Sequence, residues 1–197
     1  MSEHTISFDY SMLQWVLSII VGVCLTKVYS TVAHHTRNRK EIIFHVPYLL
    51  LIGHIFFLLI YLWFTSPSRY QTVESNRLAF LVIIIVDSLA VIFTFAALPS
   101  EEMLSESNLN LKTIYMDSKR NWAVILCGWI ICGLILSTIF GSAHSEKPYF
   151  EFMAGNLAAF VLMVSVTVLM LKSNNDWIHT GIQMLGNLSM ISSILTS

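Results

Sequence analysis

One long apolar run, residues 78–98, constrains the fold of this chain more than any other feature. The run is 21 residues long and contains a single charged residue, Asp87, near its middle. A helix rises 1.5 Å per residue, so about 20 apolar residues span the roughly 30 Å hydrocarbon core of a bilayer. The run predicts a transmembrane helix with Asp87 near the midplane. A carboxylate there costs roughly 2.5–3.5 kcal/mol and needs a partner, a water-filled cavity or a proton.

Five further apolar segments flank this run. All six are continuous rather than alternating, which favours helices over a membrane β-barrel. Helices also satisfy their own backbone polar groups in lipid. We expect an all-α, polytopic transmembrane helix bundle that forms one integral membrane domain over residues 1–197. Its spans are expected at residues 10–30, 42–64, 78–98, 122–140, 150–171 and 177–197.

The composition agrees with a membrane protein. Hydrophobic residues make up 55% of the chain and charged residues 12%, about half of the roughly 25% charged residues of a soluble domain. The net charge of −1 argues against nucleic-acid binding, which requires a basic face. The three cysteines all lie in apolar runs, and an odd number there does not indicate a disulfide framework. We expect the lipid bilayer as the main partner and no nucleic acid.

Two segments carry signals beyond hydropathy. The fourth segment is predicted to extend at its N-terminal end as a helix from about Leu111, with Asn110 as the N-cap. The sixth segment carries polar residues at helical spacing: Asp176, Thr180, Gln183 and Asn187. Such a segment either spans with this polar stripe turned inward or lies flat at the interface. We favour spanning, because its C-terminal half lacks the Lys and Arg of a surface helix.

The orientation follows from the basic residues of the loops. Placing loops one, three and five inside puts eight Lys and Arg residues there, against three outside. The positive-inside rule then places both termini outside. We expect the protein in a plasma membrane, specifically the inner membrane of a bacterium.

A resemblance supports the same architecture. The first span ends in a basic loop, and the aromatic-rich second span contains IYLWF. FAALPSEE and then LKTIYMDSKRNWAVIL lead into the fourth span. This order resembles a group of uncharacterised bacterial integral membrane proteins with six spans. The resemblance covers about residues 13–140 and implies a six-span fold, but it implies no activity.

Polar residues within the spans are the candidate binding or permeation residues. His54 lies near the middle of the second span, at nearly the depth of Asp87, and consecutive antiparallel spans are neighbours. We therefore predict that His54 pairs with Asp87 and that Asn187 completes a polar layer at the midplane. Three more polar side chains complete the candidate set: Ser88 beside Asp87, Asn156 nearer the outer face and Gln183 nearer the inner face.

Structural alternatives stand beside these roles. Asp87 alone, bonded to Ser88 or Thr94, serves helix packing, and His54 alone is a neutral histidine bonded to a carbonyl. Haem needs two imidazoles on facing helices at one depth, and only His45 with His179 approaches that arrangement. The sequence contains no nucleophile elbow, no H-E-x-x-H and no P-loop. We expect no catalytic activity, no metal and no cofactor.

Two function classes follow. The first is a small channel or transporter for an ion, a proton or a small solute. The alternative is a membrane-embedded binding, sensor or accessory protein without a permeation path. The polar stripe of the sixth segment distinguishes the two classes. A stripe that is accessible to water favours transport, and a stripe that packs fully against neighbouring helices favours the alternative. Small residues four apart, such as Gly155 and Ala159, predict close helix packing, either within one chain or between the chains of a homo-oligomer.

Overall fold

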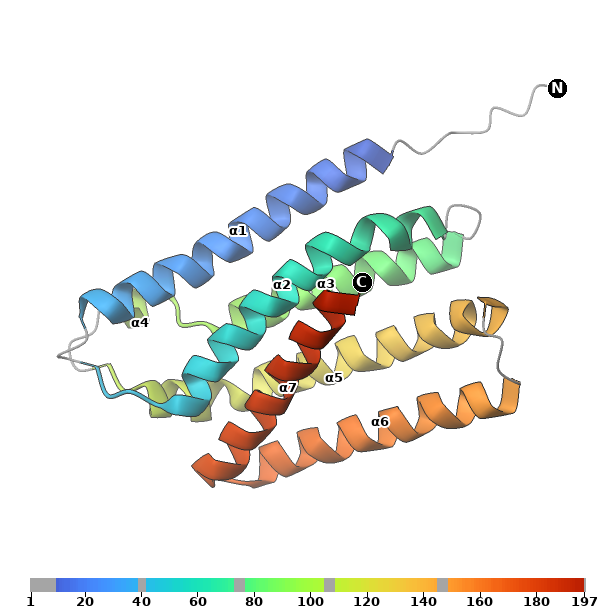
Figure 1. Cartoon of the computed structure of the whole chain (residues 1–197). Coiled ribbons are helices and arrows are strands. Elements are labelled where there is room, and N and C mark those ends of the chain that lie inside the picture. Colours follow the sequence, from blue (N-terminus) through green and yellow to red (C-terminus); the bar gives the residue numbers. More distant parts are fainter. Residues whose placement is uncertain (1–9, 39–41, 73–76, 105–108, 145–148, 197) are drawn as a thin grey trace.

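The computed structural model describes residues 10–38, 42–72, 77–104, 109–144 and 149–196. Those residues form six long helices and one single-turn helix, arranged as a bundle (Figure 1). The predicted all-α class is confirmed for this part of the chain. The helices are α1 (Tyr10–Arg37), α2 (Val46–Thr72), α3 (Arg77–Ala97), α4 (Glu101–Leu104), α5 (Leu111–His144), α6 (Tyr149–Lys172) and α7 (Asp176–Thr196).

Membrane-spanning character is clear for half of the long helices. Within the described residues, three stretches are long and apolar enough to cross a membrane: Gln14–Arg37, Val46–Thr65 and Leu81–Leu104. A shorter apolar stretch, Phe160–Lys172, lies in α6. The chain is therefore a helical membrane protein. The fourth, fifth and sixth expected spans form helices α5, α6 and α7, and the described residues of these helices contain no further stretch that meets the same criterion.

The start of α2 differs from the sequence prediction. Residues 42–45 precede the helix as an extended segment, and Ile43 forms an isolated parallel β-bridge with Asn110. The Ile43 N–H donates to Leu109 O at 3.0 Å, and the Leu111 N–H donates to Ile43 O at 3.1 Å. Pro47 is the second residue of α2, where its missing N–H costs nothing, so Pro47 gives no cause for a kink there.

The predicted start of the fourth helix is confirmed. Helix α5 begins at Leu111, and Asn110 Oδ1 accepts the Lys112 N–H at 3.0 Å and the Thr113 N–H at 3.4 Å. This is an N-cap that satisfies otherwise unpaired amides of the first turn. The helix has 34 residues and is about 51 Å long, so it is much longer than a bilayer core requires.

Helix α2 lies at the centre of the bundle. It packs against α1, α3, α5 and α7, and its contact with α7 is the most extensive of these. Helix α5 packs between α3 and α6, while α6 and α7 touch each other far less. Figure 1 shows α6 and α7 diverging from the short turn that joins them. Residues of both helices line the candidate site described below.

Three loops gather at one end of the bundle, which we call the loop end. The β-bridge joins the loop before α2 to the loop before α5. The third loop, between α6 and α7, is bound through Lys119, whose Nζ donates to Ser173 O and to Asn174 Oδ1, each at 2.9 Å. These contacts connect the first, third and fifth loops, the same three that the basic-residue count assigns to the inside.

Candidate functional site

A cavity of about 340 Å³ lies between helices α2, α3, α5, α6 and α7. Leu51, His54 and Phe93 are its lining residues on α2 and α3. Most of its wall is apolar and comes from α5, α6 and α7. Volumes of about 300–1,000 Å³ with few polar groups are typical of small-molecule sites.

His54 is a predicted site residue that lines this cavity. Gly186 of α7 lies directly against its ring, since a Cβ added to Gly186 would lie 3.1 Å from both Cε1 and Nδ1 of His54. On the α3 side, the His54 and Phe93 rings meet edge to face with centroids 6.5 Å apart. The imidazole therefore lies between α3 and α7, and a side chain at position 186 would require the ring to shift by a few tenths of an ångström.

Asn187 forms the second polar contact between α2 and α7. Its Nδ2 donates to the backbone carbonyl of Leu50 at 3.0 Å, and its amide is also a hydrogen-bond partner of His54. Asn187 and His54 thus lie together, as the predicted polar layer requires. Their shared surroundings are packed helix rather than an open channel.

The cavity also has two indole rings in its wall. Trp122 and Trp129 are seven residues apart on α5, so they lie two turns apart on the same helix face. Phe93 lies edge to face with Trp122, with ring centroids 6.1 Å apart. Among the described atoms, the indole nitrogens of both tryptophans and Nδ1 of His54 are buried without a hydrogen-bond partner.

One side of the cavity faces the surroundings of the bundle. Leu162 of α6 and Leu185 of α7 line it, and they are 63% and 70% exposed. Phe93, Trp122 and Met170 line it as well and are buried. The cavity therefore has a closed floor toward α3 and α5 and an open rim between α6 and α7. In a membrane this rim faces lipid.

A buried polar cluster closes the cavity toward the loop end. His179 Nε2 lies 3.0 Å from Ser173 O, and His179 Nδ1 lies 2.9 Å from the Tyr115 hydroxyl. A carbonyl only accepts, so Nε2 carries the proton and the Tyr115 hydroxyl donates to Nδ1. Gln183, which lines the cavity, is a further hydrogen-bond partner of Tyr115. Burial raises the pKa of Tyr115 to about 12, so the phenol keeps its proton.

One ion pair lies beside this cluster. Lys112 Nζ and Asp176 Oδ2 form an ion pair at 2.8 Å, with both side chains about half exposed. The hydrogen bond from Lys112 holds the pKa of the Asp176 carboxyl below its usual value. His45 lies near the same ion pair, and the centroid of its ring is 5.2 Å from the centroid of the Tyr115 ring. Tyr115 also contacts His179 with centroids 5.3 Å apart, so a tyrosine accompanies the two histidines considered for haem.

The remaining predicted residues lie away from the cavity. Asp87 is buried in α3 and shares a helix face with Thr94, seven residues further on, whose hydroxyl is a hydrogen-bond partner of Cys24 in α1. This face of α3 points toward α1. Ser88 is exposed. Asn156 belongs to α6, and its side chain lies outside the part that the structure describes.

The predicted pairing of His54 with Asp87 gains no support from the described contacts. His54 contacts Phe93, six residues beyond Asp87 in α3. Six residues correspond to about 9 Å along the helix and about 120° around it. The two side chains share a general depth, as predicted, but the described neighbours of His54 lie on α7 and at a different level of α3. The pairing stays a prediction.

Sequence reasoning missed the tryptophans and the loop-end cluster. Trp122 stands at the start of the fourth expected span, where an interfacial tryptophan is common, yet it is 1% exposed and lies within the bundle. The spacing of Tyr115, Trp122 and Trp129, each seven residues from the next, is the sequence signal for one aromatic face of α5. Among the described residues, no group of three or more His, Cys, Asp or Glu side chains is placed to hold a metal ion.

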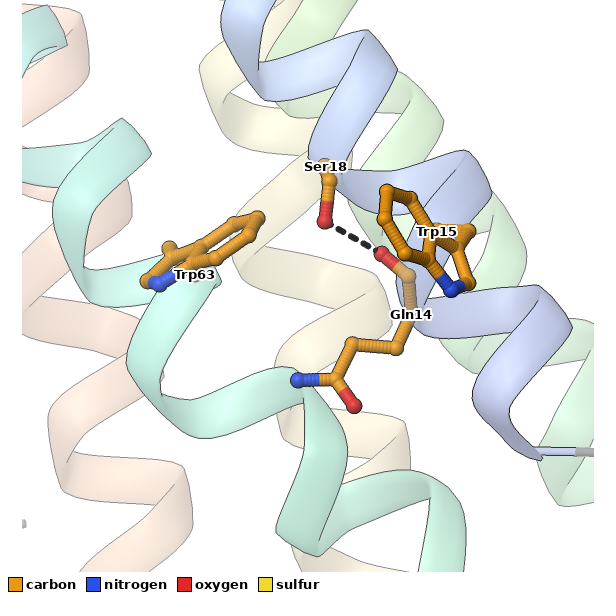
Figure 2. A pocket seen from close by; sticks show the side chains of 4 residues that line it. All are labelled: Gln14, Trp15, Ser18 and Trp63. Atoms are coloured by element: carbon orange, nitrogen blue, oxygen red, sulfur yellow. Dashed lines mark hydrogen bonds between the residues drawn. The ribbon is translucent and has the colours of Figure 1, made fainter.

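A second hollow, of about 420 Å³, lies between the N-terminal turns of α1 and the C-terminal half of α2 (Figure 2). Its walls are Gln14, Trp15 and Ser18 of α1 and Trp63 of α2. The Ser18 hydroxyl donates to Gln14 O at 2.6 Å, and Trp15 is 71% exposed. This hollow is larger but open, and its two indoles lie where an interfacial aromatic belt is expected. The enclosed cavity is the better candidate site.

Comparison with known proteins adds no relative to this picture. No protein-family model matches the chain, and searches of curated proteins and of solved structures find no match either. Since function belongs to sites rather than to folds, the functional argument depends on the cavity and its polar groups.

Proposed function

We propose that this chain is a membrane-embedded binding protein that holds a small molecule in the cavity between α2, α3, α5, α6 and α7. The single observation that carries this proposal is the cavity itself, about 340 Å³ with a largely apolar wall that includes His54. This binding class is the second of the two classes that the sequence left open.

The packing of the polar stripe favours binding over the expected channel or transporter. Gln183 and Asn187, the inner half of the stripe, are both buried. Gln183 is bonded to Tyr115 of α5, and Asn187 is bonded to Leu50 of α2. A permeation path needs such groups to face water, whereas these face neighbouring helices. These contacts position α7, and α7 in turn forms part of the cavity wall.

We further propose that all six long helices cross the membrane, with both termini outside. Support comes from the loop end, where the first, third and fifth loops meet. An up-and-down bundle brings alternate loops to the same side. These three loops and their flanks contain eight of the eleven Lys and Arg residues, so the loop end is the inner face. The assignment to a bacterial inner membrane is part of this proposal.

A matched pair of variants tests the binding function. Val166 of α6 lines the cavity, while Val168, two residues further on, is 42% exposed on the outer side. We expect wild type and Val168→Phe, released from lipid nanodiscs, to retain one small molecule in native mass spectrometry. Val166→Phe fills the cavity and should retain none. Two results together would support the channel class instead. The wild-type protein would retain no small molecule, and liposomes that contain it would show an ion flux that Asp87→Asn abolishes.

A further inference from the structure

Three residues that line the cavity each have a buried nitrogen without a hydrogen-bond partner among the described atoms. Nδ1 of His54 and the indole nitrogens of Trp122 and Trp129 are buried without partners. Buried polar groups in native structures almost always have partners, because an unmade hydrogen bond destabilises the fold. An indole N–H only donates. Whatever satisfies these tryptophans therefore supplies acceptor atoms, of which oxygen is the usual one.

The wall of the cavity also restricts the charge of an occupant. Its described lining residues include no Asp, Glu, Lys or Arg, and its polar members are His54, Thr167, Gln183 and Ser189 besides the two indoles. An ionised group without a counter-charge is costly in a low-dielectric site. The hydroxyl of Thr167 already donates to Met163 O at 2.9 Å. The wall therefore selects an uncharged polar group.

The route into the cavity follows from its two sides. The open rim at Leu162 and Leu185 faces lipid, while the loop-end cluster closes the direction toward one membrane surface. His54 and Trp122 belong to α2 and α5, on the side opposite the rim. A molecule that enters between α6 and α7 can place its polar end near these groups and leave an apolar tail in the bilayer.

We infer that the cavity takes an uncharged amphiphile directly from the bilayer, and that the indole donors of α5 and the His54 imidazole hydrogen-bond the oxygen atoms of its polar end. This inference rests on the proposed binding function and names the ligand class. Neutral lipids with ester carbonyls and alkyl quinones share this chemistry.

Photoactivatable probes with one hexadecyl tail and different ends distinguish the classes. The ends are a methyl ester, a quinone, no polar group, a sulfonate and a quaternary ammonium. We expect ester or quinone to label α6 and α7 about five- to tenfold more than the plain alkane, the equivalent of one or two net hydrogen bonds. The preferred one identifies the lipid or quinone source. Sulfonate and ammonium should label no more than the alkane.

Conservative variants locate the contact. His54→Phe, Trp122→Phe and Trp129→Phe keep an aromatic ring in the wall but remove a nitrogen. At least one should abolish the preference for the oxygen-bearing probe while plain alkane labelling persists, which also shows that the cavity is intact. Trp63→Phe, in the separate hollow of Figure 2, should leave the preference unchanged.

Two results overturn different claims. Labelling by the sulfonate or ammonium probe as strong as by the ester and quinone, or an unchanged preference in all three cavity variants, rejects the uncharged-ligand inference and leaves a binding cavity. Wild-type labelling by none of the five probes, with no molecule retained in native mass spectrometry, rejects the proposed function itself.

Discussion

His54 shows how one side chain depends on the residue opposite it. A Cβ at position 186 would lie 3.1 Å from the ring, closer than ordinary van der Waals contact. Gly181 on the same helix has nothing within 4 Å of an added Cβ. We expect Gly186→Ala to displace the imidazole and lower the thermal stability in detergent, while Gly181→Ala leaves it unchanged or raises it slightly through better helix propensity. Equal effects of the two changes would mean that the contact is not tight.

A double-mutant cycle tests which partner His54 has. His54→Leu and Asn187→Leu remove two groups that touch, so their effects on the free energy of unfolding should be non-additive by about 0.5–3 kcal/mol. His54→Leu and Asp87→Leu should add to within about 0.5 kcal/mol if His54 packs on α3 mainly through Phe93, six residues beyond Asp87. Strong coupling of His54 with Asp87 and none with Asn187 would restore the pairing predicted from the sequence.

His45 gives the loop end a dependence on pH. Burial lowers its pKa, and Lys112 and His179 act in the same direction while Asp176 opposes them. Because the folded-state pKa lies below the unfolded value, the unfolded state binds the proton more readily. Stability is therefore present above about pH 6.5 and falls as the pH drops below it. We expect the melting temperature in detergent to fall between pH 7.5 and 5, and His45→Gln to make that fall smaller. An identical fall in His45→Gln contradicts the assignment.

For single residues, the sequence predicted the depth in the membrane better than it predicted the contact partners. Burial of Asp87, the central place of His54 and the proximity of His54 to Asn187 follow from counting residues along apolar segments. The partner of His54 could not be predicted, since it depends on how far α3 is shifted and rotated against α2. That shift is determined by packing between residues distant in sequence, such as Phe93 on Trp122.

At the scale of whole elements, α5 and α7 show what a pattern determines. The cap at Asn110 predicted the start of α5, because capping is a local interaction. The polar stripe of α7 predicted an inward face, and Gln183 and Asn187 do face inward. Which groups the stripe contacts could be learned only from the folded structure. Asn187 binds a carbonyl of α2 that is 137 residues away, and a backbone acceptor leaves no signal in the sequence.

Helix α6 offers a surface for a second copy of the chain. It packs mainly against α5, and Gly155 is exposed with nothing within 4 Å of an added Cβ. We expect Gly155→Leu to leave the helical content unchanged but to reduce the assembly to a smaller species in native mass spectrometry, because close helix pairing in lipid requires small residues. A wild type that is already monomeric, or a variant that assembles normally, argues against this interface.

The arrangement of the whole molecule predicts which end faces the cell interior. Asn174 is exposed in the turn before α7 and lies at the loop end through its bond to Lys119. In a variant without the three native cysteines, we expect Asn174→Cys to react with an impermeant thiol reagent only after the cells are lysed. Cysteines at Ser2 and Ser197 should react in intact spheroplasts. The reverse pattern would invert the topology, and labelling of the two terminal sites on opposite sides would mean an odd number of spans.

The long separation between Asn187 and its acceptor has a consequence for the order of synthesis. Chains grow at about 5–20 residues per second, so α7 follows its docking surface on α2 by about 7–27 s. During that interval the face of α2 around Leu50 and His54 is made but lacks the helix that covers it. The insertion machinery or lipid must shield that face until the last helix arrives. Shortening the chain before Asp176 should therefore leave a protein that enters the membrane yet is degraded quickly.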